Sequence, residues 1–183
     1  MALASLVINA CGGHEPRETA RQSGEAARVA APQDTSFMGT LGPLARASRP
    51  GTPPRVLRGV AVASAPGYDR VVFEFTDDSV PGYHVEYTTQ PVRRCGSGDA
   101  VTVAGAGKLV VRFEPAQAHD ERGNPTVAER ERMLGLPAAK EMQLICDFEG
   151  QVEWVLGVAA AHPYRVLESP GPGRVVVDIR HHP

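Results

Sequence analysis

Two short stretches of the chain contain residue types that hydrolytic enzymes use. Asp77 and Asp78 are adjacent, and paired carboxyl groups whose pKa values separate serve as acid and base in glycoside hydrolysis. Adjacent residues of a strand point to opposite faces, however, and Asp-Asp-Ser before Val-Pro-Gly is typical of a turn. Ser97 stands between two glycines, one residue short of the Gly-x-Ser-x-Gly nucleophile motif, and is also typical of a turn. We therefore expect no catalytic residue and a protein that is not an enzyme.

The histidines do not form a metal-binding pattern. None stands four residues from a second ligand on an expected helix, which is the spacing of helical zinc sites. We expect no metal, no cofactor and a solvated pair of histidines at the C-terminus. The six histidines are His14, His84, His119, His162, His181 and His182.

Four residues are candidates for ligand binding. Tyr68 and Arg70 flank the start of an expected strand, and Arg93 and Arg94 precede Cys95 in a loop that begins with proline. Guanidinium groups form paired hydrogen bonds with carboxylates, and a tyrosine ring combines an apolar body with a polar tip. The alternative, which the sequence leaves open, is that all four are ordinary surface residues.

The elements that must position these residues are short strands, which begin near Arg55. In residues 70–75, apolar side chains recur at every second position, as in a half-buried strand. A turn at Glu149 and Gly150 separates two further alternating runs, which predicts a hairpin. The same alternation recurs in residues 83–87, 109–113 and 174–179.

One segment favours a helix. Thr126 followed by Glu129 has the spacing of a capping box, and Gly135 stands where such a helix would end. Together with the strands, this predicts a mainly β fold, an antiparallel β-sandwich with one short helix in a long connection.

The N-terminal part of the chain has a different composition. Residues 12–54 hold six prolines, six glycines and a single aromatic residue, Phe37, which predicts a flexible Gly/Pro-rich tether before a folded domain at 55–183. Residues 1–11 end in Ile-Asn-Ala-Cys, a lipobox-like segment in which Cys11 would carry the lipid. The apolar stretch before it is short for a signal sequence, so we expect a start upstream. The alternative is a cysteine that occurs there by chance.

Composition excludes two classes of partner. The formal net charge of −2 gives no overall positive field to attract nucleic acid. No apolar run has the roughly 18 residues that a membrane-spanning helix needs. We therefore expect no nucleic-acid partner and a membrane contact only through a lipid anchor.

The remaining cysteines predict a disulfide. A domain held outside the cytosol would leave Cys95 and Cys146 free to pair. Cys146 shares its alternating row with Leu144 and Phe148, which predicts an inward side chain and a bridge between the two sheets. Two buried free thiols or a metal pair are the alternatives.

Three motifs carry a family resemblance: GYDRVVFEF, the cysteine pair, and FEGQVEWVLGV. With these motifs, the chain from about Val60 to Arg180 resembles the AMIN-like domain of secreted actinobacterial proteins and lipoproteins. The resemblance implies a β-sandwich related to the AMIN domain, a module that accompanies cell-wall amidases and secretins and whose usual proposed ligand is peptidoglycan.

The resemblance and the residues together predict a non-catalytic module of the cell envelope. It would be extracytoplasmic, lipid-anchored or secreted, and would contact peptidoglycan or a wall-associated protein, with carboxylates of the wall peptides as partners for the arginines. The alternatives are a lipoprotein that docks an exported partner protein and a wall hydrolase with an unrecognised site.

Overall fold

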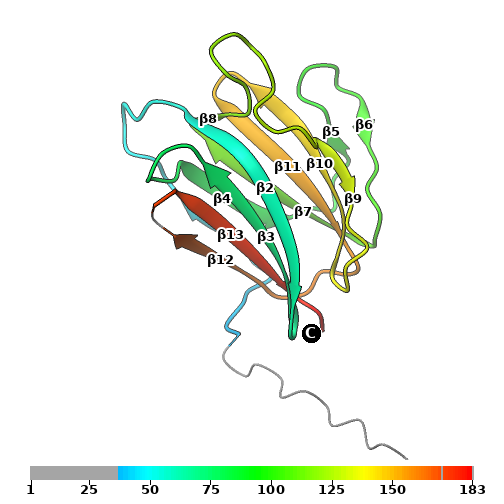
Figure 1. Ribbon diagram of the computed structural model, residues 1–183. Coiled ribbons are helices and arrows are strands. Elements are labelled where there is room, and N and C mark those ends of the chain that lie inside the picture. The colour runs from blue at the N-terminus through cyan, green and yellow to red at the C-terminus, as the bar shows by residue number, and fades with distance from the viewer. Residues whose placement is uncertain (1–36, 170, 183) are drawn as a thin grey trace, which may run out of the picture. The chain divides into compact units, whose positions relative to one another are not determined.

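The computed structural model describes residues 37–169 and 171–182, which form two large β-sheets and a small third one (Figure 1). All strand pairs are antiparallel except β2 with β8, so the predicted mainly β, antiparallel architecture is confirmed. The six-stranded sheet contains, in spatial order, β1 (Leu44–Arg46), β4 (Gly82–Tyr87), β7 (Gly107–Glu114), β11 (Gln151–Val158), β10 (Ala139–Phe148) and β9 (Glu131–Met133). The five-stranded sheet contains β12 (Tyr164–Ser169), β13 (Arg174–Arg180), β3 (Tyr68–Phe75), β2 (Arg55–Ala65) and β8 (Ala116–Gln117).

The core lies between the two large sheets, where the alternation predicts it. On β3, every second side chain from Asp69 to Phe75 is buried. The ring of Phe73 lies 4.9 Å from that of Phe113 on β7 and 6.1 Å from that of Trp154 on β11. Because these rings come from both sheets, their burial holds the two layers together.

The hairpin predicted at Glu149 and Gly150 joins β10 to β11. Phe148 pairs with Gln151 across it. The φ angles of the two turn residues are 50° and 77°, the left-handed values that a two-residue type I′ turn requires.

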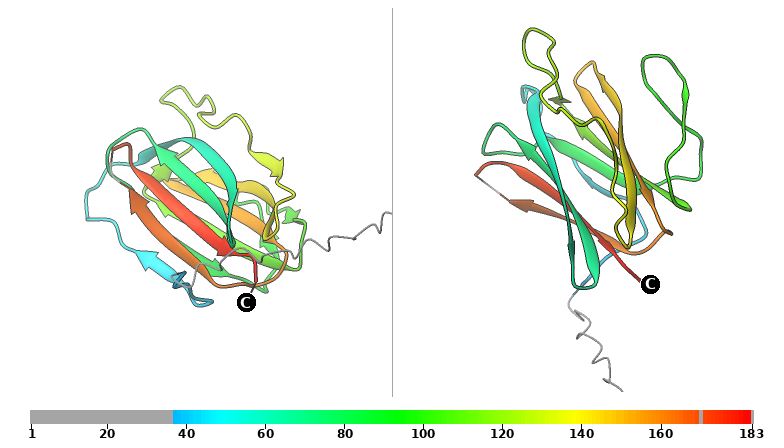
Figure 2. Two further views of the ribbon diagram at one scale, coloured as in Figure 1. Left: turned by 60° about the horizontal axis from the view of Figure 1, so that its bottom comes forward. Right: turned by 45° about the vertical axis from the view of Figure 1, so that its right-hand side comes forward.

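A flap, which we define as residues 92–103, covers the solvent-side face of the six-stranded sheet. It contains the small sheet of β5 (Val92–Arg93) and β6 (Ala100–Val101). Figure 2 shows this segment in green on the side of β10 and β11 that faces away from the five-stranded sheet. Beneath it lies a second, smaller apolar cluster of Val92, Val103, Val110, Ile145 and Val155.

The predicted disulfide between Cys95 and Cys146 is present, but it does not join the two large sheets. The pairing register of β10 shifts between Leu144 and Cys146, a β-bulge at Ile145. Beyond the bulge the faces exchange, so Cys146 points to the flap and Phe148, predicted to face inward, is 61% exposed. The expected inter-sheet bridge is therefore wrong, because a bulge turns every later side chain to the other face.

The predicted helix does not form. Residues 126–130 are irregular, and residues 131–133 are strand β9, paired with β10. The hydroxyl of Thr126 donates to the carbonyl of Leu57 on β2, 2.6 Å away, instead of capping a helix. Val127 is buried in the core. These long-range contacts outweigh a local capping pattern.

The described part of the expected tether belongs to the sandwich. Phe37 is buried, and Thr40 exchanges two backbone hydrogen bonds with Tyr164 at the edge of β12. Strand β1 then pairs with β4 of the other sheet. The tether prediction is wrong for residues 37–46, because the one aromatic side chain of the segment finds a place to bury. Residues 12–36 of the tether and Cys11 lie outside the described residues.

Candidate functional site

The five-stranded sheet turns one face to the core and one to solvent, and we call the solvent side the outer face. On β3 the outer positions are the even-numbered residues from 68 to 74, since the odd-numbered ones are buried. A groove of about 640 Å³ crosses this face. Its floor is small and apolar, and charged side chains stand toward both ends. The groove is lined by Gly59, Val60, Ala61, Arg70, Val72, Glu74, Ser169, Arg174 and Val176.

Two arginines share one carboxylate toward one end of the groove. Arg70 donates to Asp178 through Nε and Nη2, at 2.7 and 2.9 Å, and Arg165 donates to the same carboxylate from Nε at 2.9 Å. The register of β12, β13 and β3 places the three residues side by side. The hydrogen bond to Asp178 raises the pKa of Arg70. Asp178 is fully buried under the two guanidiniums, while the Arg70 side chain remains 36% exposed.

A second shared carboxylate lies toward the other end. Glu74 accepts from Nε of Arg174 at 2.5 Å and from Nε of Arg58 at 2.7 Å. These hydrogen bonds, that of Arg174 first, lower the pKa of Glu74. Glu74 is thus ionised at neutral pH, and both guanidiniums keep donors that face solvent.

Aromatic rings and arginines stack beyond the Asp178 end of the groove. The Phe37 ring lies 5.7 Å from that of Tyr68, and the guanidinium of Arg165 lies 4.4 Å from the centre of the Phe37 ring. Arg180 approaches the same ring at 5.8 Å. Cation–π contacts of this kind hold the N-terminal segment on the sheet.

The outer face carries an excess of positive charge. Five arginines and two carboxylates leave it with a formal charge of +3, although the whole chain carries −2. A positive surface on a weakly acidic protein attracts anionic ligands locally. The charged residues of the outer face are Arg58, Arg70, Arg165, Arg174, Arg180, Glu74 and Asp178.

The four predicted ligand-binding residues are not brought together. Tyr68 and Arg70 lie on the outer face, whereas Arg93 and Arg94 lie on the flap, against the other sheet. Arg93 donates to the carbonyl of Gly98 within the flap, and Arg94 donates to that of Leu144 on β10. The two flap arginines therefore hold the flap in shape and against β10.

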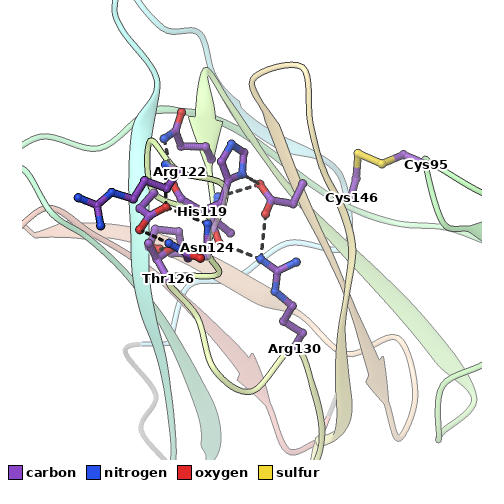
Figure 3. Close-up of polar contacts among 12 residues, drawn as sticks. Cys95, His119, Arg122, Asn124, Thr126, Arg130 and Cys146 are labelled. Carbon is purple, nitrogen blue, oxygen red and sulfur yellow. Dashed lines mark hydrogen bonds and ion pairs between the residues drawn. A yellow bond between two sulfur atoms is a disulfide. The ribbon is translucent and has the colours of Figure 1, made fainter.

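A network of polar contacts orders the connection between β8 and β9 (Figure 3). The bulge turns Asp147 to the inner side of β10, where its side chain is only 9% exposed. Its carboxylate accepts from the backbone N–H of Ala118 and lies 2.9 Å from Nδ1 of His119. Its other oxygen accepts from Arg130 at 3.0 Å. Arg130 also donates to the carbonyl of Ala118. Every partner in this network is internal to the loop and β10, so it stabilises the loop.

The tip of this connection is a turn built around one carboxylate. Asp120 accepts from the backbone N–H groups of Arg122 and Asn124 and from the Asn124 side chain, at 2.8 to 2.9 Å. The side-chain hydrogen bond from Asn124, followed by the backbone bond, lowers the pKa of Asp120. Asx turns of this kind fix backbone shape, so the exposed tip is preorganised.

A buried carboxylate, Asp69, joins β3 to the start of β10. It accepts from the N–H groups of Ala138 and Ala139 at 2.6 and 2.9 Å, from Ser64, and lies 2.8 Å from Nε2 of His181. Burial raises the pKa of Asp69, but the hydrogen bonds outweigh burial and hold that pKa below its ordinary value. The expected solvation of His181 is wrong, since its side chain is 14% exposed.

Of the seven charged residues of the outer face, sequence reasoning selected only Arg70 as a candidate for the site. The alternation of β13 already places Arg174 and Asp178 on the side away from the core. The alternation does not show which charged side chain lies next to which, because that depends on the order of the strands in the sheet.

No group of three or more histidine, cysteine, aspartate or glutamate side chains is placed to hold a metal ion within residues 37–169 and 171–182. The same part of the chain contains no helix of the length and apolarity that crossing a membrane requires.

Comparison with known proteins identifies a family. The sequence model described as the AMIN-like domain matches residues 55–181, from the first residue of β2 to just past the end of β13. No curated protein and no solved structure matches the chain.

Proposed function

Because the chain belongs to the AMIN-like domain family, we propose that it is a non-catalytic module of the cell envelope that binds peptidoglycan through its outer face. The family points to a cell-wall-related module outside the cytosol, and the Cys95–Cys146 disulfide fits that compartment. The observation that carries the choice of surface is the excess of arginine over carboxylate on the outer face, because peptidoglycan is an anionic polymer. The role of this module would be to recognise the wall and to localise the protein there.

Co-sedimentation with purified sacculi tests this proposal. The purified full-length protein should pellet with intact sacculi and stay in solution after muramidase digestion. Ala61→Glu adds a negative charge to the floor of the groove, and we expect it to reduce the bound fraction about fivefold or more. Ala45→Glu is the matched control, an exposed strand alanine on β1, and should pellet like wild type.

The flap variants separate the two predicted surfaces. If Arg93→Ala with Arg94→Ala lowers pelleting and Ala61→Glu does not, the flap rather than the outer face is the binding surface. If the wild-type protein fails to pellet with sacculi at all, peptidoglycan is not its ligand.

We further propose that Cys11 carries a lipid that holds the domain at the membrane. Metabolic labelling with a fatty acid should mark the wild-type protein and not Cys11→Ser, and the variant should move from the particulate to the soluble fraction. Absence of label in both proteins, with unchanged fractionation, would contradict the anchor and leave a secreted protein.

A further inference from the structure

Each carboxylate of the outer face is shared by two arginines. Asp178 accepts from Arg70 and Arg165, and Glu74 accepts from Arg174 and Arg58. Each cluster therefore keeps a formal charge of +1, and its guanidiniums are held in place by the carboxylate between them. Such clusters can accept one more anion without having to be ordered first.

The two clusters are separated along the strands by a fixed distance. Asp178 pairs with Arg70 and Arg174 pairs with Glu74 in the same β13–β3 ladder, four residues apart. At about 3.3 Å per residue, the centres of the clusters lie about 13 Å apart. An extended ligand with two anionic groups at that spacing would reach both.

The floor between the clusters suits a peptide better than a sugar ring. Val72, Val176 and Ala61 form it, and no aromatic side chain lines this groove. Tyr68 stands outside the groove, and its ring already contacts Phe37, Arg70 and Arg165. A floor of small aliphatic side chains accommodates methyl groups such as those of alanine.

The other sheet offers a comparison. A groove of about 620 Å³ along β1, β4 and β7 contains Arg46 and Arg112, but also Glu86 and Glu114. Its formal arginine and glutamate charges balance, so it has no comparable preference for an anion.

From these observations we infer that the outer-face groove binds the carboxylate-bearing peptides of the wall polymer rather than its sugar chain, with one carboxylate at each arginine cluster. This inference rests on the proposed function and names the part of the polymer that is recognised.

The ligand side of the inference is tested with two synthetic peptides. Glu-Ala-Ala-Ala-Glu places two carboxylates about 13 Å apart when extended, and Gln-Ala-Ala-Ala-Gln has the same size without charge. Both peptides have blocked ends and carry no label, and isothermal titration calorimetry measures their binding. We expect the glutamate peptide to bind the full-length protein about tenfold or more tightly than the glutamine peptide, with affinity falling as salt rises. Equal binding of the two peptides would overturn the inference.

The contribution of the protein is tested with the double variant Arg58→Gln and Arg174→Gln. It removes both arginines of the more exposed cluster, the one around Glu74, and leaves buried Asp178 with both of its arginine partners. We expect this double variant to lose about tenfold in affinity for the glutamate peptide. Arg112→Gln is the matched control, an arginine of similar exposure paired with Glu153 on the other sheet, and should bind like wild type. An unchanged melting temperature shows that the fold is intact, and wild-type affinity in the double variant would contradict the inference.

Sacculi separate this inference from the proposed function. One outcome is that the wild-type protein pellets with sacculi in a way that neither added glutamate peptide nor the double arginine substitution reduces. That result would support peptidoglycan binding but contradict the inference that the groove binds the wall peptides. If the protein binds the glutamate peptide but not sacculi, peptidoglycan binding is contradicted, and the groove is assigned to an acidic peptide of other origin.

Discussion

Replacing Cys95 and Cys146 by serine together will lower the free energy of unfolding by about 4 kcal/mol, since the disulfide closes a loop with a sequence separation of 51 residues. The cross-link restricts the unfolded chain, and longer loops lose more entropy when they are closed. Urea unfolding of the double serine variant and of the oxidised wild type, at the same pH, measures the difference. An unchanged midpoint would show that the disulfide contributes nothing to stability.

The position of the disulfide predicts which part of the serine variant loses stability first. In the native state, the flap is held to β10 by the disulfide, by the Arg94 contact and by the Cys95 N–H, which donates to Ile145 at 3.0 Å. Amide hydrogen exchange should therefore accelerate in residues 92–103 of the serine variant before it does in β3. Wild type reduced with dithiothreitol serves as the control, because it lacks the bond but keeps the cysteine side chains.

Removal of the Asp69 carboxylate is the second change with a large expected effect. Asp69→Ala leaves the N–H groups of Ala138 and Ala139 without their acceptor in the core, and we expect a loss of about 3 to 5 kcal/mol. Asp69→Asn keeps one acceptor oxygen and should lose less. Asp78→Asn, in an exposed loop, is the control and should unfold like wild type. Equal stability of Asp69→Ala and wild type would contradict a stabilising role.

The same carboxylate predicts a dependence on pH. The pKa of Asp69 is lower in the folded protein than in the unfolded chain, where it is close to 3.8. Its contribution to stability is therefore fully present above that value and is lost as the pH falls through the lower, folded value. The urea midpoint of wild type should fall between pH 5 and pH 2.5, and that of Asp69→Asn should fall less. Parallel decreases in the two proteins would assign the acid sensitivity to other carboxylates.

The N-terminal segment shows why the boundary of the domain depends on single residues. Its composition is that of a flexible linker, and the family match begins only at Arg55. Yet Phe37 is buried beside Tyr68, and the hydroxyl of Tyr164 donates to the carbonyl of Gly42 at 2.7 Å. One buried ring and a few hydrogen bonds are enough to attach a segment whose average composition predicts otherwise.

Local alternation was sufficient for the class of the fold. The apolar rows of β3, β7 and β13 point to the core as predicted, because in a strand every second side chain faces the same way whatever its partners. The hairpin at Glu149 and Gly150 was equally predictable, since this Glu-Gly dipeptide stands between two alternating runs, where a tight turn is needed. The disulfide between Cys95 and Cys146 was predicted because an extracytoplasmic domain with two cysteines favours their pairing, without any knowledge of the distance between them.

Only the tertiary structure decided what depends on distant neighbours. The bulge at Ile145 reverses the faces of Cys146 and Phe148, and contacts from Thr126 to Leu57 replace a helix by an irregular segment and β9. On the outer face, the sequence placed Arg70 at the surface but did not show that it shares Asp178, 108 residues away, with Arg165. Alternation is a property of consecutive residues, whereas a shared carboxylate requires that three strands lie in one order and register.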